Sequence, residues 1–506
     1  MSRRGHRQRR NVKAVRQLPW QSLRNPFSPV EILSADQVES ILDAALTILE
    51  TTGFRFLQEE CRAYLKTAGA DASDPGGMVR MDRGLVTEML RHAPAEFNLR
   101  ARNPARNLHI GSNSIVFTGV GGPAFVSDLD KGRRPGTFAE MCDYLRLIQS
   151  LNIIHQEGGG CFEPMDLPPE SRHLDLHLAQ LTPMDKNAQG VALGRARIVD
   201  GMEMNSIALG ISREDLEKEP ALLAIVNTNS PMQLDIPMTE AVIEMARALQ
   251  VTCITPFTLA GSMSPATLAG TLAQQTAEVL AVVTLAQIVR PGAPVMYGAF
   301  ASNVDMQSGA PALGTPEYTK MAFASGQIAR RLGIPFRSSN TTTANCVDAQ
   351  SAYESEMSLW GAVMGHANLV NHAAGWLEGG LTASFEKLIV DAEMLQMMAE
   401  TLKPIAVNED ELALATIAEV PPGGHHFGTA HTLARYETAF YAPMVSNRQN
   451  FEAWQEAGSI DTVKRANSIW KELLSNYEKP PIDPAIEEAL ISYTARRKEE
   501  IAKQIN

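Results

Sequence analysis

The chain has 506 residues, 44% of them hydrophobic and 20% charged, and 45 Lys and Arg against 57 Asp and Glu give a formal net charge of −12. This composition supports a large buried core and excludes a disordered chain. The acidic balance argues against nucleic acid as a partner, because neutralising phosphates requires clustered Lys and Arg.

The sequence contains no stretch that approaches about 20 apolar residues, so no membrane partner is predicted. The basic start of the chain is followed by Asn11-Val12-Lys13 rather than by an apolar segment, so no secretory signal is predicted. We therefore expect a cytoplasmic protein.

The first part of the chain divides at about residue 30. Residues 1–30 are basic, contain Pro19, Pro26 and Pro29, and have no period, so we expect a basic flexible arm there. A cap at Ser34, apolar residues at helical spacing and a stop at Gly53 predict a helix. With two shorter helices over 58–68 and 82–92, residues 31–112 are predicted to form an N-terminal helical region.

From residue 113 to 402, short apolar runs alternate with helical patterns. The runs lie at 114–118, 152–156, 187–193, 222–228, 251–257, 294–300, 334–339 and 368–373. Each interval accommodates one strand, one helix and two loops, and eight such units predict a TIM (β/α)8 barrel. A doubly wound open sheet is the rival, but no GxGxxG follows the first run.

Residues 403–506 are predicted to form a C-terminal helical extension. Pro421-Pro422-Gly423-Gly424 interrupts the chain after the last barrel helix. Helical patterns follow over 450–457 and 459–476 and again from residue 485.

In a barrel, the active site is built at the C-terminal ends of the strands. Aromatic residues gather near those ends, and a cage of aromatic faces suits a quaternary ammonium ligand. Core packing is the competing explanation for each of them. The cage candidates are Phe125, Phe257, Tyr297, Tyr353 and Trp376.

The five cysteines are odd in number and widely spaced, which fits neither a disulfide framework nor a CxxC zinc site. Glu157, Cys161, Cys346 and His372 could all face the barrel mouth, and zinc accepts such ligands. No two of them have the usual ligand spacing on one element, so we predict no resident metal.

Several separate segments resemble the trimethylamine methyltransferase family of corrinoid-dependent enzymes, which have a TIM-barrel fold. The resemblance runs from about residue 35 to the C-terminus. The segments are 132–137 (GRRPGT), 258–261 (TLAG), 265–273 (PATLAGTLA), 291–298 (PGAPVMYG), 348–354 (DAQSAYE), 372–381 (HAAGWLEGGL), 424–427 (GHHF) and 431–432 (HT).

The resemblance implies transfer of a methyl group to the Co(I) of a separate corrinoid protein, with no tightly bound cofactor. Trimethylamine members carry pyrrolysine in the loop after the seventh strand, where this chain has Asn345, three residues before Asp348. Members without pyrrolysine resemble demethylases of quaternary amines such as glycine betaine. A quaternary nitrogen is already a good leaving group, so the site need only hold the cation, orient one methyl and exclude water.

Carried over residue by residue, the resemblance implies that His372 contacts the substrate and that Asn345 lines the pocket. Arg337 is our candidate for a betaine carboxylate on chemical grounds. Glu378 and Asp348 are expected to support the site from behind, and no catalytic residue is assigned. We also expect a homo-oligomer. Two alternatives stay open: a zinc-dependent methyltransferase of a thiol-type substrate, and a non-catalytic barrel that binds quaternary amines.

Overall fold

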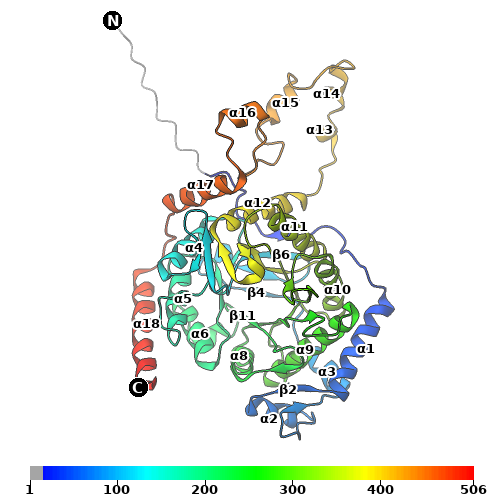
Figure 1. Cartoon of the computed structure of the whole chain (residues 1–506), viewed down its shortest axis with the longest axis vertical. Coiled ribbons are helices and arrows are strands. Elements are labelled where there is room, and N and C mark those ends of the chain that lie inside the picture. Colours follow the sequence, from blue (N-terminus) through cyan, green and yellow to red (C-terminus); the bar gives the residue numbers. More distant parts are fainter. Residues whose placement is uncertain (1–14, 506) are drawn as a thin grey trace.

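Eight short runs of β-branched and small residues form the parallel strands of a closed barrel in the computed structural model, which describes residues 15–505 (Figure 1). The strands pair in the order β6-β19-β18-β15-β13-β11-β10-β9, and pairing of Thr118 with Gln156 closes the ring between β6 and β9. The predicted TIM barrel is therefore confirmed. Its strands are β6 (Ser114–Gly119), β9 (Gln156–Glu157), β10 (Asn187–Gly190), β11 (Leu223–Val226), β13 (Val251–Ile254), β15 (Val295–Gly298), β18 (Phe336–Ser339) and β19 (Leu369–Ala374).

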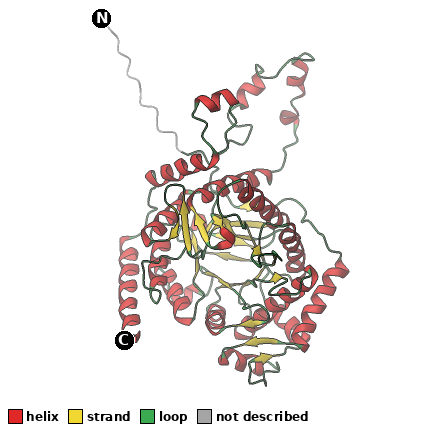
Figure 2. Ribbon diagram, in the orientation of Figure 1, coloured by secondary structure: helices red, strands yellow, loops and turns green. Residues whose placement is uncertain are grey.

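A ring of helices surrounds the strands, one following each strand (Figure 2). Capping boxes at Thr137 and Asp348 begin two of them. The ring consists of α4 (Phe138–Ser150), α5 (Arg172–Leu181), α6 (Arg195–Leu209), α8 (Ile236–Arg247), α9 (Leu268–Val289), α10 (Pro316–Leu332), α11 (Ala349–Met364) and α12 (Phe385–Thr401), with the short α7 (Arg213–Leu216) between α6 and β11.

Helix α9 corrects one expectation from the sequence. An 18-residue window of this 22-residue helix reaches a mean hydropathy of 1.4, so among residues 15–505 one helix is long and apolar enough to cross a membrane. The expectation that no apolar stretch approaches that length is wrong. However, 89% of this segment is buried in the protein, where α9 packs against α1 (Ala35–Thr51), α3 (Arg83–Leu90) and α8. Its apolar composition is that of a core helix.

The barrel interior has an apolar lower layer and a polar layer above it. The lower layer includes Val116, Leu223, Val251, Met296 and Leu369, and the hairpin of β4 (Phe97–Leu99) and β5 (Leu108–Ile110) closes it from below.

In the upper layer, Gln189 Nε2 donates to Asn371 Oδ1 (2.9 Å) and Gln156 Oε1 (3.1 Å), and Thr118 Oγ1 donates to Asn371 Oδ1 (2.7 Å). Amide side chains paired in this way can be buried at little cost. They form the floor of the barrel mouth.

Residues 15–30 differ from the predicted flexible arm, whose residues 1–14 lie outside the described chain. The strand β1 (Leu23–Arg24) pairs antiparallel with the start of β6. The Trp20 ring lies edge-on to His155, with ring centroids 5.0 Å apart, and 4.3 Å from the Arg106 guanidinium. These contacts are with the start of β6 and with residues near it, so the segment lies across the bottom of the barrel.

Residues 31–112 contain α1, α2 (Glu59–Thr67), α3 and short strands. A capping box at Ser34 begins α1. The strands β2 (Phe54–Phe56) and β3 (Met78–Val79) form a small sheet with β12 (Gln233–Leu234), and η1 (Pro104–Arg106) lies between β4 and β5. Figure 1 shows α1, α2 and α3 on one side of the barrel, beside α9.

The C-terminal residues extend over two sides of the barrel. Helix α17 (Thr462–Ser475) packs against α12 and α4, and α18 (Pro484–Ile505) lies along α5 and α6. Between α12 and α17 the chain forms only short helices: α13 (Glu409–Leu412), α14 (Leu414–Glu419), α15 (Ala430–Arg435) and α16 (Phe451–Glu456).

A four-stranded sheet stands beside the barrel mouth in the order β20-β21-β7-β8, and a smaller sheet, β14-β16-β17, follows the fifth and sixth barrel strands. Their strands are β7 (Phe125–Asp128), β8 (Gly132–Pro135), β20 (Trp376–Leu377), β21 (Thr382–Ser384), β14 (Leu259–Ala260), β16 (Ser302–Val304) and β17 (Pro311–Ala312); η2 (Glu378–Gly380) connects β20 to β21.

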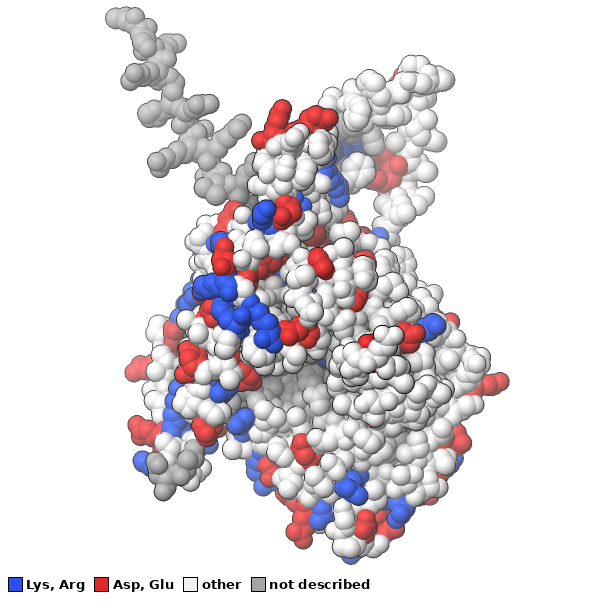
Figure 3. Space-filling model, viewed as in Figure 1, with Lys and Arg blue, Asp and Glu red and all other residues white. Residues whose placement is uncertain are grey.

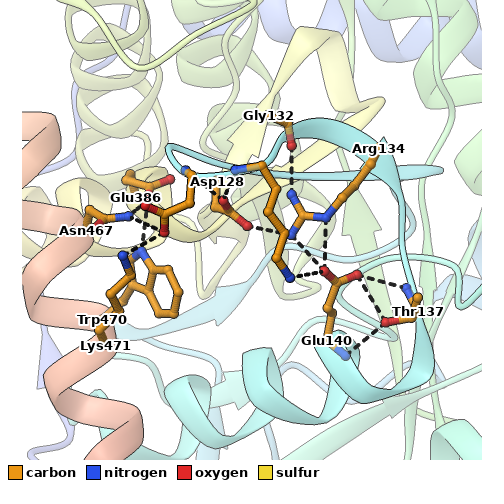
Figure 4. Close-up of polar contacts among 11 residues, drawn as sticks. Asp128, Gly132, Arg134, Thr137, Glu140, Glu386, Asn467, Trp470 and Lys471 are labelled. Carbon is orange, nitrogen blue, oxygen red and sulfur yellow. Dashed lines mark hydrogen bonds and ion pairs between the residues drawn. The ribbon is translucent and has the colours of Figure 1, made fainter.

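Ion pairs anchor the β7–β8 hairpin. Arg134 bridges Asp128 and Glu140 at the start of α4 (Figure 4). On the α17 side, Lys471 pairs with Asp130 at 2.6 Å, while Trp470 Nε1 donates to Glu386 Oε1 at 2.9 Å. The hairpin is thus fixed to both α4 and α17.

Candidate active site

A cavity of about 350 Å³ opens at the C-terminal ends of the barrel strands. Every strand contributes to its wall, either directly or through the residues that follow it. The contributions, in chain order, include Gly121, Gly159, Gln189, Asn227, Thr255, Phe300, Arg337 and His372. This is the face on which TIM barrels carry their active sites.

Arg337 is the buried charge of the cavity. It points inward from β18 and is 1% exposed. Its Nη1 makes one long hydrogen bond, 3.4 Å to Ala299 O, and its Nε has no partner. No carboxylate within residues 15–505 forms an ion pair with it, and burial lowers the pKa of this guanidinium. A buried guanidinium without an anion is costly, so this arrangement can bind a ligand that supplies one.

His372 lies in the second half of β19, where the strand register shifts between Val370 and Ala374. Its φ of +52° is in the left-handed region, which a non-glycine residue rarely adopts. Its amide N–H donates to Thr118 Oγ1 (3.1 Å), and its ring Nδ1 accepts from the amide of Gly121 (3.2 Å). Burial and the nearby Arg337 hold the pKa of His372 well below its usual value, so the ring is neutral.

Aromatic rings line one side of the cavity around Phe300. Its ring centroid lies 6.3 Å from His372, 5.9 Å from Trp376 and 5.2 Å from Phe257. The His372 and Trp376 rings are themselves 4.6 Å apart. Of the predicted site residues, Arg337 and His372 line the cavity, while Trp376 and Phe257 support its aromatic wall through Phe300.

Tyr297 and Phe125 are not brought to the cavity. Tyr297 is fully buried, and its hydroxyl contacts Gln275 Nε2 (3.0 Å) and Thr276 Oγ1 (2.8 Å) on α9, behind the barrel wall. Phe125 is covered by the Arg133 guanidinium, 3.6 Å above its ring. Neither face is free for a ligand.

The residues expected from the loop after β18 lie at the surface. Tyr353 is 59% exposed on α11, and Asn345 is exposed in the loop. Asp348 caps α11, accepting from the Ser351 amide, and Glu378 pairs with Arg133 through two hydrogen bonds of 2.7 and 3.0 Å. Placing Asn345 and Tyr353 in the pocket is therefore corrected: the loop turns Asn345 outward, and Tyr353 lies on the solvent-facing side of α11.

Two functional residues were not predicted. Phe300 lies four residues beyond Met296, which packs in the barrel interior. Side chains alternate along a strand, so Phe300 points to the same side as Met296, and this alternation could have identified it. Glu354 is the second. It accepts hydrogen bonds from Thr342 Oγ1 (2.5 Å) and the Thr343 amide (2.9 Å), and thereby holds the loop whose Thr342 carbonyl accepts from Trp376 Nε1 (3.1 Å).

The residues considered for zinc do not converge. Across residues 15–505, no group of three or more His, Cys, Asp and Glu could hold a metal. The Glu157 carboxylate instead accepts from the amides of Gly159 (2.7 Å) and Gly160 (2.8 Å), and burial raises its pKa to about 7. Cys346 is exposed and lies 3.5 Å from Asp348 Oδ2.

Comparison with solved structures supports the fold. The monomethylamine methyltransferase MtmB of Methanosarcina barkeri superposes with a TM-score of 0.51 at 10% identity, covering 90% of each chain. A hydroxylamine complex of MtmB gives the same TM-score at 11% identity, covering 89% of this chain and 90% of that one.

Sequence comparison identifies the family. The glycine betaine methyltransferase of Desulfitobacterium hafniense (strain Y51) is 36% identical over 474 residues, 94% of this chain and 98% of that protein. The trimethylamine methyltransferase MttB1 of Methanosarcina mazei is 26% identical over 474 residues, 90% of this chain and 93% of that protein. The family sequence model described as trimethylamine methyltransferase (MTTB) matches residues 1–502. The chain is therefore a methyltransferase acting on a methylamine-type substrate, and it belongs to the trimethylamine methyltransferase family.

Proposed function

We propose that this enzyme removes a methyl group from a betaine, a quaternary amine that carries a carboxylate, and passes it to the Co(I) of a separate corrinoid protein in the cytoplasm. The observation that carries the proposal is Arg337, a buried cation in the cavity without an anionic partner among residues 15–505. Trimethylamine has no carboxylate to offer it, whereas every betaine has one.

A carboxylate at Arg337 would satisfy the unpaired guanidinium. The unpartnered Nε and the weakly bonded Nη1 supply hydrogen-bond donors, and two parallel N–H donors match the two oxygens of a carboxylate. A buried charge without its partner is strongly destabilising, and the fold already holds Arg337 in that state. Part of the binding energy of the ligand therefore comes from giving the Arg337 guanidinium an anionic partner.

The aromatic wall suits the other end of the same ligand. Phe300, Trp376 and the neutral His372 present ring faces, to which a quaternary ammonium is attracted. The low pKa of His372 matters here, because a protonated ring would repel the cation. Glu163, the one carboxylate in the lining within residues 15–505, pairs with Arg172 at 2.9 Å, so it is not free to hold the cation.

The reaction requires only that the protein bind the quaternary amine and orient one of its methyl groups. One methyl carbon–nitrogen bond breaks, its electron pair stays on nitrogen, and a neutral tertiary amine is left. No proton is required at that step, so the cavity residues need only bind the substrate and orient one methyl group. The corrinoid supplies the nucleophile that takes the methyl group.

The rim of the cavity fits a large flat partner group. Its glycines, at 121–122 and 158–160, follow the first two barrel strands. Gly122 has a φ of +86°, and a Cβ there would meet nothing within 4 Å, so the rim is low and open at this point. A side chain at Gly122 would stand in that open space. Gly121 and Gly158 are instead needed for close backbone packing, since a Cβ at Gly121 would lie 1.9 Å from the Gly158 carbonyl oxygen.

Binding by titration calorimetry tests the proposal. Glycine betaine should bind the native protein at least 100-fold more tightly than choline or trimethylamine, which lack the carboxylate. In Arg337→Met that preference should disappear. Arg197→Met removes another arginine of the cavity lining, whose Nη2 donates to the Pro169 carbonyl at 3.2 Å, and should change glycine betaine affinity by less than about threefold.

Turnover is then followed with free cob(I)alamin as methyl acceptor and dimethylglycine as the measured product. Proline betaine and carnitine are compared in both assays. Loss of betaine binding in Arg197→Met but not in Arg337→Met would refute the assignment of the carboxylate, and preference for trimethylamine over every betaine would refute the proposed substrate class.

A further inference from the structure

The floor of the cavity is the upper end of a chain of four amide side chains that crosses the barrel interior. Asn187 and Gln189 of β10, Gln156 of β9 and Asn371 of β19 are each at most 2% exposed. Gln189 and Asn371 line the cavity, and Figure 3 shows the surface hollowed near the centre of the face that carries the β20-β21-β7-β8 sheet. The chain therefore connects the lower part of the barrel with the wall of the site.

Backbone carbonyls fix the direction of this chain at its lower end. Asn187 Nδ2 donates to the Arg100 carbonyl at 2.7 Å and to the Ala221 carbonyl at 2.8 Å. A carbonyl can only accept, so the Asn187 amide has one possible orientation. Its Oδ1 then faces Gln156 Nε2, which donates to it at 2.6 Å.

Each amide fixes the orientation of the next one. Gln156 Oε1 accepts from Gln189 Nε2 at 3.1 Å, and the second hydrogen of Gln189 Nε2 goes to Asn371 Oδ1 at 2.9 Å. Asn371 Nδ2 is thereby directed at His372, 3.3 Å from its Nε2. Turning Asn371 over would set its NH2 group against that of Gln189, so the chain holds Asn371 as it is.

His372 consequently faces a hydrogen-bond donor at each of its ring nitrogens. The Gly121 amide lies 3.2 Å from Nδ1, and a backbone N–H cannot exchange its role for that of an acceptor. A neutral imidazole offers one acceptor, whereas a protonated ring would set two N–H groups against two donors. The surroundings therefore oppose protonation, in the same direction as burial and the charge of Arg337, which lower the pKa of His372.

We propose that the four amides act as a positioning relay, which holds an N–H group of Asn371 against Nε2 of His372 and so keeps the ring neutral. A neutral ring attracts a quaternary ammonium through its face, and a charged ring repels it. This use of the relay rests on the proposed function, but the relay itself belongs to the ligand-free protein. Gln189 and Asn371 are thus positioning residues that act through His372.

Other titratable groups line the cavity or lie directly behind its rim. They are Arg337 of β18, Glu163 with its partner Arg172, His173 with its partner Asp200, Arg197 of α6, and Glu157 of β9. Burial raises the pKa of Glu157 to about 7, so this carboxylate changes its charge in the range where an ordinary histidine does. The charge of the His372 ring must therefore be observed directly, in addition to the binding of a ligand.

The first test observes the ring nitrogens of His372 in the ligand-free full chain. The protein is labelled with ¹⁵N-histidine, and the signals of His372 are those missing from His372→Asn. In the native protein the ring should stay neutral from pH 8 down to about pH 5.5. Asn371→Asp keeps the oxygen that accepts from Gln189 and replaces the NH2 group facing Nε2 by a second oxygen. In this variant the ring should be protonated at pH 5.5.

A second variant tests the relay one step away from the ring. Gln189→Met frees Asn371 to turn its oxygen towards Nε2, so His372 should take up its second proton at a higher pH than in the native protein. Gln275→Met is the matched control, since Gln275 is also a buried glutamine but donates to the hydroxyls of Tyr297 and Ser325. The control should leave the His372 signals unchanged, and circular dichroism checks the fold of each variant.

Titration calorimetry with glycine betaine connects the relay with binding. A ring with an ordinary pKa is only about one-tenth neutral at pH 5.5. Asn371→Asp should therefore bind about tenfold more weakly at pH 5.5 than at pH 8, beyond any change seen in the native protein. An affinity that follows the native pH profile would refute the use of the relay in holding a cation.

Three results of the nitrogen spectra would overturn the relay. They are a native ring that is protonated at pH 5.5, a ring that stays neutral in Asn371→Asp, and a Gln189→Met spectrum identical to the native one. A protein that binds no betaine would refute the proposed function instead, and the spectra of the ligand-free protein would still decide whether the relay exists.

Discussion

The guanidinium carbon of Arg337 lies 5.1 Å from the centroid of the Phe300 ring. The same ring contacts His372 and Trp376 on its other sides. Phe300 therefore touches both the residue proposed to hold a carboxylate and the rings proposed to hold a cation. Side chains packed on one ring would therefore bind both the carboxylate and the cation of a zwitterion.

Arg337→Met should make the ligand-free protein more stable. The change removes a buried cation without an anion among residues 15–505 and replaces it with an apolar chain of similar length. We expect the free energy of unfolding in urea to rise by about 1–3 kcal/mol. The native protein should gain stability with added glycine betaine and the variant should not. A variant less stable than the native protein would mean that Arg337 is satisfied within the fold.

The left-handed backbone at His372 predicts which substitutions fold. Asn tolerates this conformation and Val does not, so His372→Asn should be more stable than His372→Val by roughly 2 kcal/mol. Both variants lose the ring that stacks on Trp376, and both should bind glycine betaine at least about tenfold more weakly. Equal stabilities in thermal unfolding would show that position 372 relaxes out of the left-handed region.

His155 should make the protein sensitive to acid. The Phe117 amide donates to its Nδ1 at 3.0 Å and its Nε2 lies 3.1 Å from the Gln21 carbonyl, so the neutral ring is bonded on both sides. Burial, with the charge of Lys186, lowers the pKa of His155 to about 3 from a usual 6.5. Between these values the unfolded chain binds the extra proton, so stability is full above pH 6.5 and falls as the pH falls towards 3.

His155→Gln keeps an acceptor and a donor but cannot titrate. Between pH 6.5 and pH 5 the native protein should lose about 2 kcal/mol more than this variant. Urea titrations at the two pH values measure the difference, and the same change at the exposed His92 serves as the control. Identical losses in native protein and His155→Gln would contradict the assignment.

Glu354→Gln should loosen the loop that supports the aromatic wall. Both Thr342 Oγ1 and the amides of Thr343 and Ala344 donate to one carboxylate oxygen, and the NH2 of Gln could face these donors only unfavourably. We expect a loss of about 1–3 kcal/mol in unfolding free energy and a shift in tryptophan fluorescence through Trp376. Glu488→Gln, on the exposed face of α18, should change neither measurement.

The barrel could be predicted because its signals are local. Strand runs and caps such as Ser34 depend on neighbouring residues in the sequence, and the eight strands lie where the apolar runs are, with β9 reduced to the end of its run. Arg337 and His372 were found for a similar reason, since both lie within the apolar runs that form the last two barrel strands.

The wall of the cavity was harder to predict. Parallel strands are buried on both faces, so the run that contains Tyr297 is apolar throughout and does not show which side chains point inward. Asn345 depends on the path of a loop that Glu354 of α11 holds in place, and Tyr353 depends on which face α11 turns towards the barrel. Residues 15–30 bind the barrel bottom through pairings with residues about 90 or more positions away, which no local pattern records.

The closed lower end of the barrel has a kinetic consequence. Below the cavity the interior is filled by the amide layer and the apolar layer, and Trp20 and the β4–β5 hairpin lie beneath them. Under the proposed function, a substrate amine and its methyl acceptor must therefore both enter through the opening at the C-terminal ends of the strands. The amine has to enter first, and the demethylated product cannot leave until the acceptor has withdrawn. Steady-state rates should follow a compulsory-order scheme, with the amine as the leading substrate and the demethylated amine as the last product released.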